Sequence, residues 1–332
     1  MATLYLLEQG AKLLKESKRL VVEKEDKILL EIPDFKIDRV FIFGNIQITT
    51  QAMKFLLESG IETSFFSVFG KLIGKLSPVE SKNVYLRINQ YEKHKDENFK
   101  LSIARVFIEG KIKNMKTVLQ KYVRNHTEID FSESFLWLDN CLAELQRKTQ
   151  VSTIVGIEGR ASAIYFECFA KMFRKELAFT GRVRRPPSDP INSLLSLGYS
   201  LITNEMLSVL SGIGFDVYIG YLHSLEYGRP SLALDLIEEF RQPIVDRLTL
   251  ELINKEILKE EDFEQKEGGV YLKDEPRRIY FRQYERRMQT EFLNLETGER
   301  TTYRKMFLHQ AQKLARTLTE GLPYTYTPFQ LR

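Results

Sequence analysis

Cysteine is scarce in this sequence of 332 residues, and its scarcity narrows the classes of protein that it can encode. The two cysteines, Cys141 and Cys168, are too few for a disulfide scaffold or a cysteine-built zinc site, and they fit a reducing compartment. The sequence also lacks a Walker-type phosphate loop, a dinucleotide fingerprint and a Gly-x-Ser-x-Gly nucleophile turn. These absences argue against nucleotide-driven chemistry and against a serine hydrolase.

Long hydrophobic runs are missing as well. The longest apolar region, Val209 to Leu222, is short and is interrupted by Asp216. The first ten residues carry no basic end followed by an apolar stretch, so they do not resemble a secretion signal. We therefore expect no membrane association and a cytoplasmic protein.

Charge of one sign is not in large excess. The sequence has 49 Lys and Arg residues against 45 Asp and Glu residues, and its net charge of +4 is too small to establish a polyanionic partner. Any argument for nucleic-acid binding must therefore rest on where the cations lie along the chain.

The hydrophobic pattern changes near Pro78. Between Leu20 and Leu76, short runs rich in branched and aromatic residues predict strands, and 50–60 predicts one short helix that a glycine ends. After Pro78, apolar residues recur at three- and four-residue spacing over long stretches, which is typical of helices. We predict an α+β protein with a β-rich domain at 1–78 and a larger, all-helical domain at 79–332.

Glu158 is the first candidate for chemistry. It lies in Gly156-Ile-Glu158-Gly, before an apolar stripe that includes Ala161, Tyr165 and Phe169. This pattern predicts a helix that begins near Glu158, with the carboxylate in its first turn. A glutamate there can serve a site, but it can equally complement the helix dipole.

A second candidate combines His223 with carboxylates on a predicted helix. Asp235 and Glu238 are one turn apart on the same face, and Ser231 is a plausible N-cap. One nitrogen and two carboxylates suit Mn²⁺ or Mg²⁺ better than a closed zinc site. The alternatives are a packed histidine and a solvated helix face.

The third candidate is a cluster of cations within fifteen residues that contain one acid, Glu176. Such a cluster could hold DNA phosphates, or it could be a solubilising helix surface with cations near its C-terminus. Its members, which we consider as nucleic-acid contacts, are Lys171, Arg174, Lys175, Arg182, Arg184 and Arg185.

Taken together, the three segments resemble the CRISPR spacer-acquisition integrases, the first family of CRISPR-associated proteins. The resemblance spans nearly the whole chain, and weaker echoes include Gly110-Lys-Ile-Lys-Asn114. Its most specific parts are Gly156-Ile-Glu158-Gly with Tyr165-Phe, the run from Arg185 to Tyr199, and His223 followed by Gly228-Arg-Pro-Ser-Leu-Ala-Leu-Asp235-Leu-Ile-Glu238.

The resemblance implies a function that spacing alone does not give. It implies a metal-dependent DNA endonuclease and integrase that joins the 3′-hydroxyl ends of new spacer DNA to the repeat array. It assigns the catalytic metal, Mg²⁺ or Mn²⁺, to Glu158, His223 and Glu238, with Asp235 as a further ligand or as an acceptor that orients them. The alternative from another class is a non-catalytic DNA-binding scaffold.

The resemblance also implies an assembly. The β-rich domain would form a homodimer, and the helical domain would carry the catalytic site. The expected partners are double-stranded or branched DNA and the small, ferredoxin-like second CRISPR-associated protein.

Overall fold

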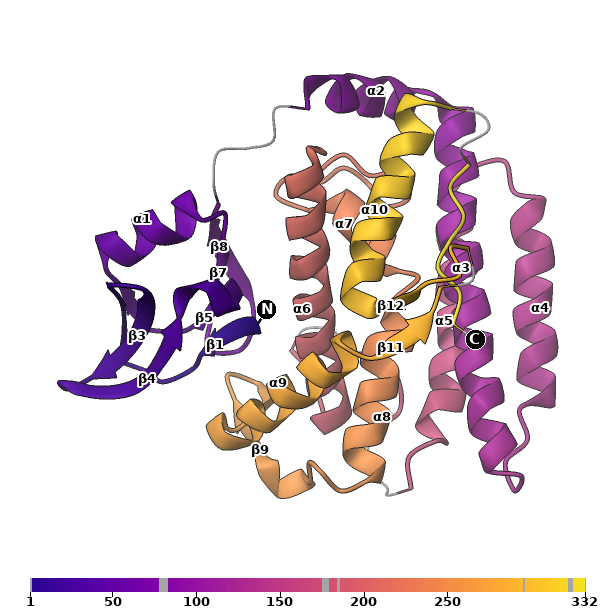
Figure 1. Ribbon diagram of the computed structural model, residues 1–332. Helices are drawn as coiled ribbons and strands as arrows, with labels where there is room; N and C mark the ends of the chain where they lie inside the picture. Colours follow the sequence, from indigo (N-terminus) through magenta and orange to yellow (C-terminus); the bar gives the residue numbers. More distant parts are fainter. Residues whose placement is uncertain are drawn as a thin grey trace. The chain divides into compact units, whose positions relative to one another are not determined.

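The structure of the chain is a computed structural model that describes residues 2–77, 83–174, 179–183, 186–294, 296–321 and 325–331. It divides into two compact units, residues 1–80 and residues 81–332 (Figure 1). The first unit is β-rich and the second is mainly helical, so the predicted α+β class is confirmed.

The described part of the first unit contains two four-stranded sheets and one α-helix, α1 (Thr50–Glu58). One sheet has the order β1 (Ala2–Leu6), β5 (Ile37–Phe43), β7 (Glu62–Phe66) and β8 (Leu72–Leu76). The other has the order β4 (Lys27–Pro33), β3 (Arg19–Lys24), β2 (Lys12–Glu16) and β6 (Gln47–Ile48). A short 3₁₀ turn, η1 (Asp34–Lys36), precedes β5.

Two strands of this unit, the central strand β5 and the edge strand β4, differ in burial. Strand β5 is parallel to both of its neighbours, and Val40 to Phe43 are almost completely buried, as expected for a strand covered on both faces. By contrast, β4 is an edge strand on which Ile28, Leu29 and Leu30 are exposed. An exposed apolar edge of this kind favours pairing with another chain.

The second unit is built from nine α-helices and a π-helical turn within its described part (Figure 1). Its helices are α2 (Val84–Lys95), α3 (Glu97–Asn125), α4 (Ser132–Gln146), α5 (Val151–Ala170), α6 (Pro190–Ile213), α7 (Ser231–Ile237), α8 (Arg247–Asn254), α9 (Asp274–Met288) and α10 (Tyr303–Thr319), with the π turn η2 at Arg241–Asp246. Two hairpins interrupt them, β9 (Phe263–Lys266) with β10 (Gly269–Leu272), and β11 (Glu291–Leu293) with β12 (Arg300–Thr302). The 3₁₀ turn η3 (Glu260–Asp262) precedes β9.

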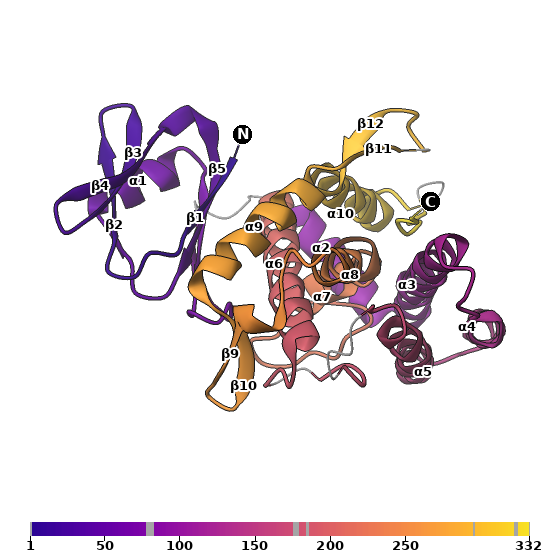
Figure 2. The same cartoon turned by 90° about the horizontal axis from the view of Figure 1, so that it is seen from below.

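Helix α3 carries part of the candidate functional site and packs against several other elements. It packs against α4 and α5 on one side, and α7 and η2 also contact it (Figures 1 and 2). A Cβ atom at Gly110 would lie 2.5 Å from the Cβ of Pro328, so glycine allows the C-terminal segment to cross this helix closely. The next residue along α3, Lys111, is buried.

Two local predictions were wrong. Helix α5 begins at Val151, two turns before Glu158, because Ile154, Ile157 and Ala161 form a continuous buried stripe despite the two glycines between them. Glu158 is therefore in the middle of a helix, and the dipole alternative does not apply. Ser231 does not cap α7, since it lies inside the helix and its hydroxyl donates to the Ser224 carbonyl at 2.9 Å.

Across the described residues, no helix is long and apolar enough to cross a membrane.

Candidate functional site

The structure brings Glu158 close to His223 and Glu238, although Glu158 lies far from both in the sequence. Glu158 projects from α5 toward α3, and the Ser162 hydroxyl, one turn further along α5, donates to its Oε1 at 2.8 Å. His223 lies in the loop between α6 and α7, and its Nε2 is 3.8 Å from Glu238 Oε1. Glu238 follows α7 directly and is almost fully buried.

Asp235 fixes the loop that carries His223. Its Oδ2 accepts hydrogen bonds from the backbone N–H groups of Tyr221 at 2.6 Å and Leu222 at 3.0 Å. Its Oδ1 accepts from the backbone N–H of His223 at 2.9 Å and contacts Nδ1 of the same residue at 2.7 Å. This arrangement leaves Nε2 as the ring nitrogen that faces Glu238.

Gly220 makes this close approach possible. A Cβ atom at this position would lie 2.7 Å from Asp235 Oδ2 and 2.8 Å from the backbone carbonyl carbon of Ser231. Any side chain would therefore push the loop away from the helix that holds Asp235. The spacing of His223 and Asp235 in the sequence does not reveal this requirement.

Lys111 lies between the two glutamates and was not among the predicted site residues. Its ammonium group contacts Glu158 Oε1 and is 2.6 Å from Glu238 Oε2. The side chain is 6% exposed, so the cation is held inside the protein next to both carboxylates. Lys111 lies at helical spacing from Phe107, Asn114 and Val118, which are buried on the same face of α3. A lysine within this stripe is the sequence signal that could have identified it.

Arg241 is the second cation at Glu238. Its Nη2 is 2.9 Å from Glu238 Oε1, and its guanidinium lies 4.6 Å from the ring centre of Tyr199. Burial by itself would raise the pKa of Glu238, but Arg241, Lys111 and His223 outweigh it and hold that pKa well below its usual range. Burial also opposes ionisation of Glu158, and Lys111 again makes the pKa lower than usual. Both carboxylates are therefore charged at neutral pH.

Glu239 points away from Glu238 into a buried layer behind the site. Its Oε1 accepts hydrogen bonds from the Tyr326 hydroxyl at 2.6 Å and Gln310 Nε2 at 3.1 Å, and its Oε2 accepts from the Phe329 N–H at 2.6 Å. Burial raises the pKa of Glu239 to about 7 despite these donors. Asn114 of α3 also joins these residues, since its amide donates hydrogen bonds to the backbone carbonyls of both Glu239 and Phe329.

The predicted cluster of cations is only partly described by the structure, because Lys175, Arg184 and Arg185 lie outside the described residues. Lys171 is exposed at the end of α5 and lies 3.4 Å from Glu167. Arg182 donates from Nη1 to Asn192 Oδ1 and from Nη2 to Ser196 Oγ, each at 3.0 Å, and its guanidinium faces the Tyr199 ring. Arg174 lines a cavity beside α8.

In the present arrangement, no three His, Cys, Asp or Glu side chains of the described residues are grouped as ligands of a single ion. In this arrangement the Lys111 ammonium stands between Glu158 and Glu238. The site nevertheless offers two ionised carboxylates and an imidazole nitrogen oriented by a carboxylate, which is a set of donors that Mn²⁺ and Mg²⁺ accept.

Comparison with known proteins gives a consistent result. Residues 4–286 match the family model described as CRISPR associated protein Cas1. The chain is 36% identical to CRISPR-associated endonuclease Cas1 3 of Thermus thermophilus, over 100% of this chain and 98% of that protein. Two solved structures are similar: a casposase bound to an integration product (27% identity, TM-score 0.86, 98% of this chain and 94% of that one) and a Cas6-RT-Cas1–Cas2 complex (26% identity, TM-score 0.85, 100% of this chain and 36% of that one). This chain belongs to the Cas1 family of CRISPR-associated proteins.

Proposed function

We propose that the protein is a metal-dependent DNA endonuclease and integrase of CRISPR adaptation. The observation that carries the proposal is that three separate segments meet at Glu238: the Lys111 ammonium joins its carboxylate to that of Glu158, and His223 Nε2 faces its other oxygen. The similar proteins support it, since one is named an endonuclease and another is a casposase bound to its integration product.

Glu158, His223 and Glu238 would hold the divalent ion. Asp235, with its four contacts to the His223 loop, would be a positioning residue that keeps Nε2 directed at the ion. The place that Lys111 now takes between the carboxylates is compatible with a cation, and an arriving ion would require the lysine side chain to move. When bound, the ion would withdraw charge from a phosphate and stabilise the leaving oxygen.

The remaining chemistry falls to the residues of the chain. A displaced Lys111 and Arg241 are the cations nearest to the carboxylates, and they are suited to hold the non-bridging oxygens of the attacked phosphate. Water would attack in the nuclease reaction, and a DNA 3′-hydroxyl would attack in strand transfer. Because one phosphodiester bond replaces another in strand transfer, that reaction needs no nucleotide cofactor.

We further propose that residues 1–78 form the dimerisation domain of a homodimer and that the helical unit is catalytic. The exposed apolar edge of β4, with Ile28, Leu29 and Leu30, supports an interface on the first unit. The similar Cas6-RT-Cas1–Cas2 complex supports a Cas2 protein as a partner of this chain.

Strand transfer with single-residue variants tests the proposed function. A DNA fragment with free 3′-hydroxyl ends is incubated with a plasmid that carries a repeat array, with Mn²⁺ and the partner protein. Glu158→Gln is expected to remove integration, and the matched control Glu167→Gln, on the exposed face of the same helix, should retain it. Full integration by Glu158→Gln would favour a non-catalytic DNA-binding scaffold instead.

A further inference from the structure

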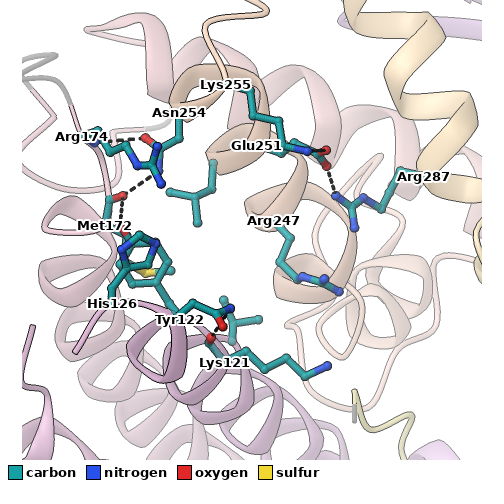
Figure 3. A pocket seen from close by; sticks show the side chains of 13 residues that line it. Lys121, Tyr122, His126, Met172, Arg174, Arg247, Glu251, Asn254, Lys255 and Arg287 are labelled. Atoms are coloured by element: carbon teal, nitrogen blue, oxygen red, sulfur yellow. Dashed lines mark hydrogen bonds and ion pairs between the residues drawn. The ribbon is translucent and has the colours of Figure 1, made fainter.

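A second feature of the helical unit is a cavity of about 440 Å³ between the C-terminal half of α3, the end of α5 and helix α8 (Figure 3). Its volume is in the range of small-molecule sites. Arg287 of α9 closes one side, and Arg174, which follows α5, lies at the exposed rim. The cavity shares no residue with the carboxylate cluster around Glu158.

The lining of this cavity is strongly cationic. Among the described residues that line it, five carry lysine or arginine cations and one, Glu251, carries a carboxylate. That carboxylate is already shared, since its oxygens lie 2.6 Å from Lys255 Nζ and 2.6 Å from Arg287 Nη2. Desolvation and the nearby Arg247 lower the pKa of Lys121, and the same two causes lower the pKa of Arg287. An anion in the cavity would relieve this crowding of like charges.

The opposite wall is aromatic and apolar. The rings of Tyr122 and His126 are stacked with their centres 4.2 Å apart, and Val118, Met172 and Leu250 complete the apolar lining. Figure 3 places the two rings across the cavity from the guanidinium groups of Arg247 and Arg287. A cavity with an aromatic side and a cationic side matches a ligand that has a flat ring and a phosphate.

Hydrogen bonds hold this wall in place. The Tyr122 hydroxyl and Asn254 Nδ2 both donate to the Met172 carbonyl, at 2.7 and 2.8 Å. The backbone N–H of Arg174 donates to Asn254 Oδ1 at 3.1 Å. These contacts join α3 and α8 to the segment after α5, so the cavity is formed without a ligand.

We infer that this cavity binds one unpaired nucleotide of single-stranded DNA, with the phosphate against Lys121, Arg247 and Arg287 and the base against the rings of Tyr122 and His126. The inference rests on the proposed function, because it assigns a second contact for a DNA substrate outside the carboxylate cluster. Stacking and phosphate contacts do not read base identity, so any sequence should bind.

The test is fluorescence anisotropy with labelled single-stranded oligo-dT, blunt duplex DNA and free dTMP as competitor. Arg247→Ala and Lys121→Ala should each weaken oligo-dT binding roughly tenfold and lower the salt slope by about one. Binding of the blunt duplex should stay unchanged. Tyr122→Phe should keep most of the oligo-dT binding, because it keeps the ring and Asn254 still donates to the Met172 carbonyl, whereas Tyr122→Leu should lose binding with the ring.

The matched control is Arg300→Ala, since Arg300 is exposed in the β11–β12 hairpin and lies outside the cavity. Lys121→Ala is the second test of the cavity. It is needed because Arg247 also interacts with Tyr303, so that Arg247→Ala can weaken the fold as well as the cavity. The inference is overturned if the cavity variants bind oligo-dT like Arg300→Ala. It is also overturned if dTMP binds as tightly as oligo-dT, which would indicate a site for free nucleotides.

Strand transfer measured in the same preparations separates the two proposals. If the wild-type protein integrates DNA and the cavity variants bind oligo-dT normally, only the cavity assignment fails. If the wild-type protein does not integrate but the cavity variants still lose oligo-dT, the proposed function fails while the nucleotide site stands.

Discussion

Glu238 and Glu239 are neighbours in the sequence, but their surroundings shift the pKa values of their carboxyl groups in opposite directions. Glu238 is buried among cations, and its pKa is held well below its usual range by Arg241 and Lys111 against the effect of burial. Glu239 is equally buried but accepts hydrogen bonds from neutral groups, and burial raises its pKa to about 7. Burial alone therefore does not decide the charge of a carboxylate; the groups that face it do.

This difference suits Glu238 to a binding site and Glu239 to a structural role. A carboxylate kept ionised by neighbouring side-chain cations can exchange those partners for a metal ion or a substrate. A carboxylate held by Tyr326, Gln310 and Phe329 instead anchors the C-terminal segment against α3. The two roles should respond differently to substitution, pH and metal.

The largest contrast is expected between Glu238→Gln and Glu239→Gln. Losing a ligand charge at Glu238 should reduce strand transfer by more than about a thousandfold, because the ion contributes several kcal/mol to the transition state. Glu239→Gln should instead lower the melting temperature and keep most of the activity. Strand-transfer rates and thermal melts of both variants measure this contrast. If Glu239→Gln lost more activity than Glu238→Gln, the assignment of Glu238 to the site would be wrong.

Lys111→Met should expose how the cluster is neutralised. Removing the ammonium leaves Glu158 and Glu238 close together without their shared cation, so stability in EDTA should fall by roughly 3 kcal/mol. Added Mn²⁺ should restore stability more in this variant than in the wild type, because the ion replaces the lost charge. Denaturant unfolding with EDTA and with Mn²⁺ tests it; an equal response in both proteins would rule out an ion at this position.

Asp235→Asn should have a smaller effect than loss of a ligand. The variant keeps the size of the side chain but weakens four contacts to the His223 loop. Activity at low Mn²⁺ should fall about ten- to a hundredfold, and a higher Mn²⁺ concentration should rescue it. A Mn²⁺ titration of the strand-transfer rate provides the measurement, and a loss that no concentration of metal rescues would contradict a positioning role.

A gradual effect, smaller over one pH unit than the changes above, is expected from the pH dependence that Glu239 confers. Because its pKa is raised in the folded state, the folded protein binds more protons than the unfolded chain between about pH 4.5 and pH 7. Its contribution is complete below the unfolded pKa and is lost as pH rises to the folded pKa, by at most about 1.4 kcal/mol per pH unit. Urea unfolding over this range should show a shallower decline for Glu239→Gln, and identical slopes would refute the assignment.

The sequence predicted much of the fold because local patterns carry it. Runs rich in branched and aromatic residues predicted strands between Leu20 and Leu76, but β1 and β2 lie before this region and were missed. The turn at Gly60 ends the region predicted for α1. Helical spacing placed Asp235 and Glu238 on one face, and the resemblance joined them to Glu158 and His223. The helical domain was predicted to lack strands, but two hairpins occur there, because short two-stranded pairs such as β9–β10 leave little periodic signal.

Only the tertiary structure decided which groups surround these residues. Lys111 reads as one of several lysines on a charged helix, and packing of α3 against α5 and η2 directs its ammonium to the two carboxylates. Glu239 directly follows the predicted ligand Glu238 in the sequence, but the Tyr326 hydroxyl and the Phe329 N–H hold its carboxylate in a buried layer away from the site. The physical reason is that charge state and burial depend on contacts between segments distant in sequence, such as α3 with the C-terminal residues, while strand and helix periodicity are set by neighbours along the chain.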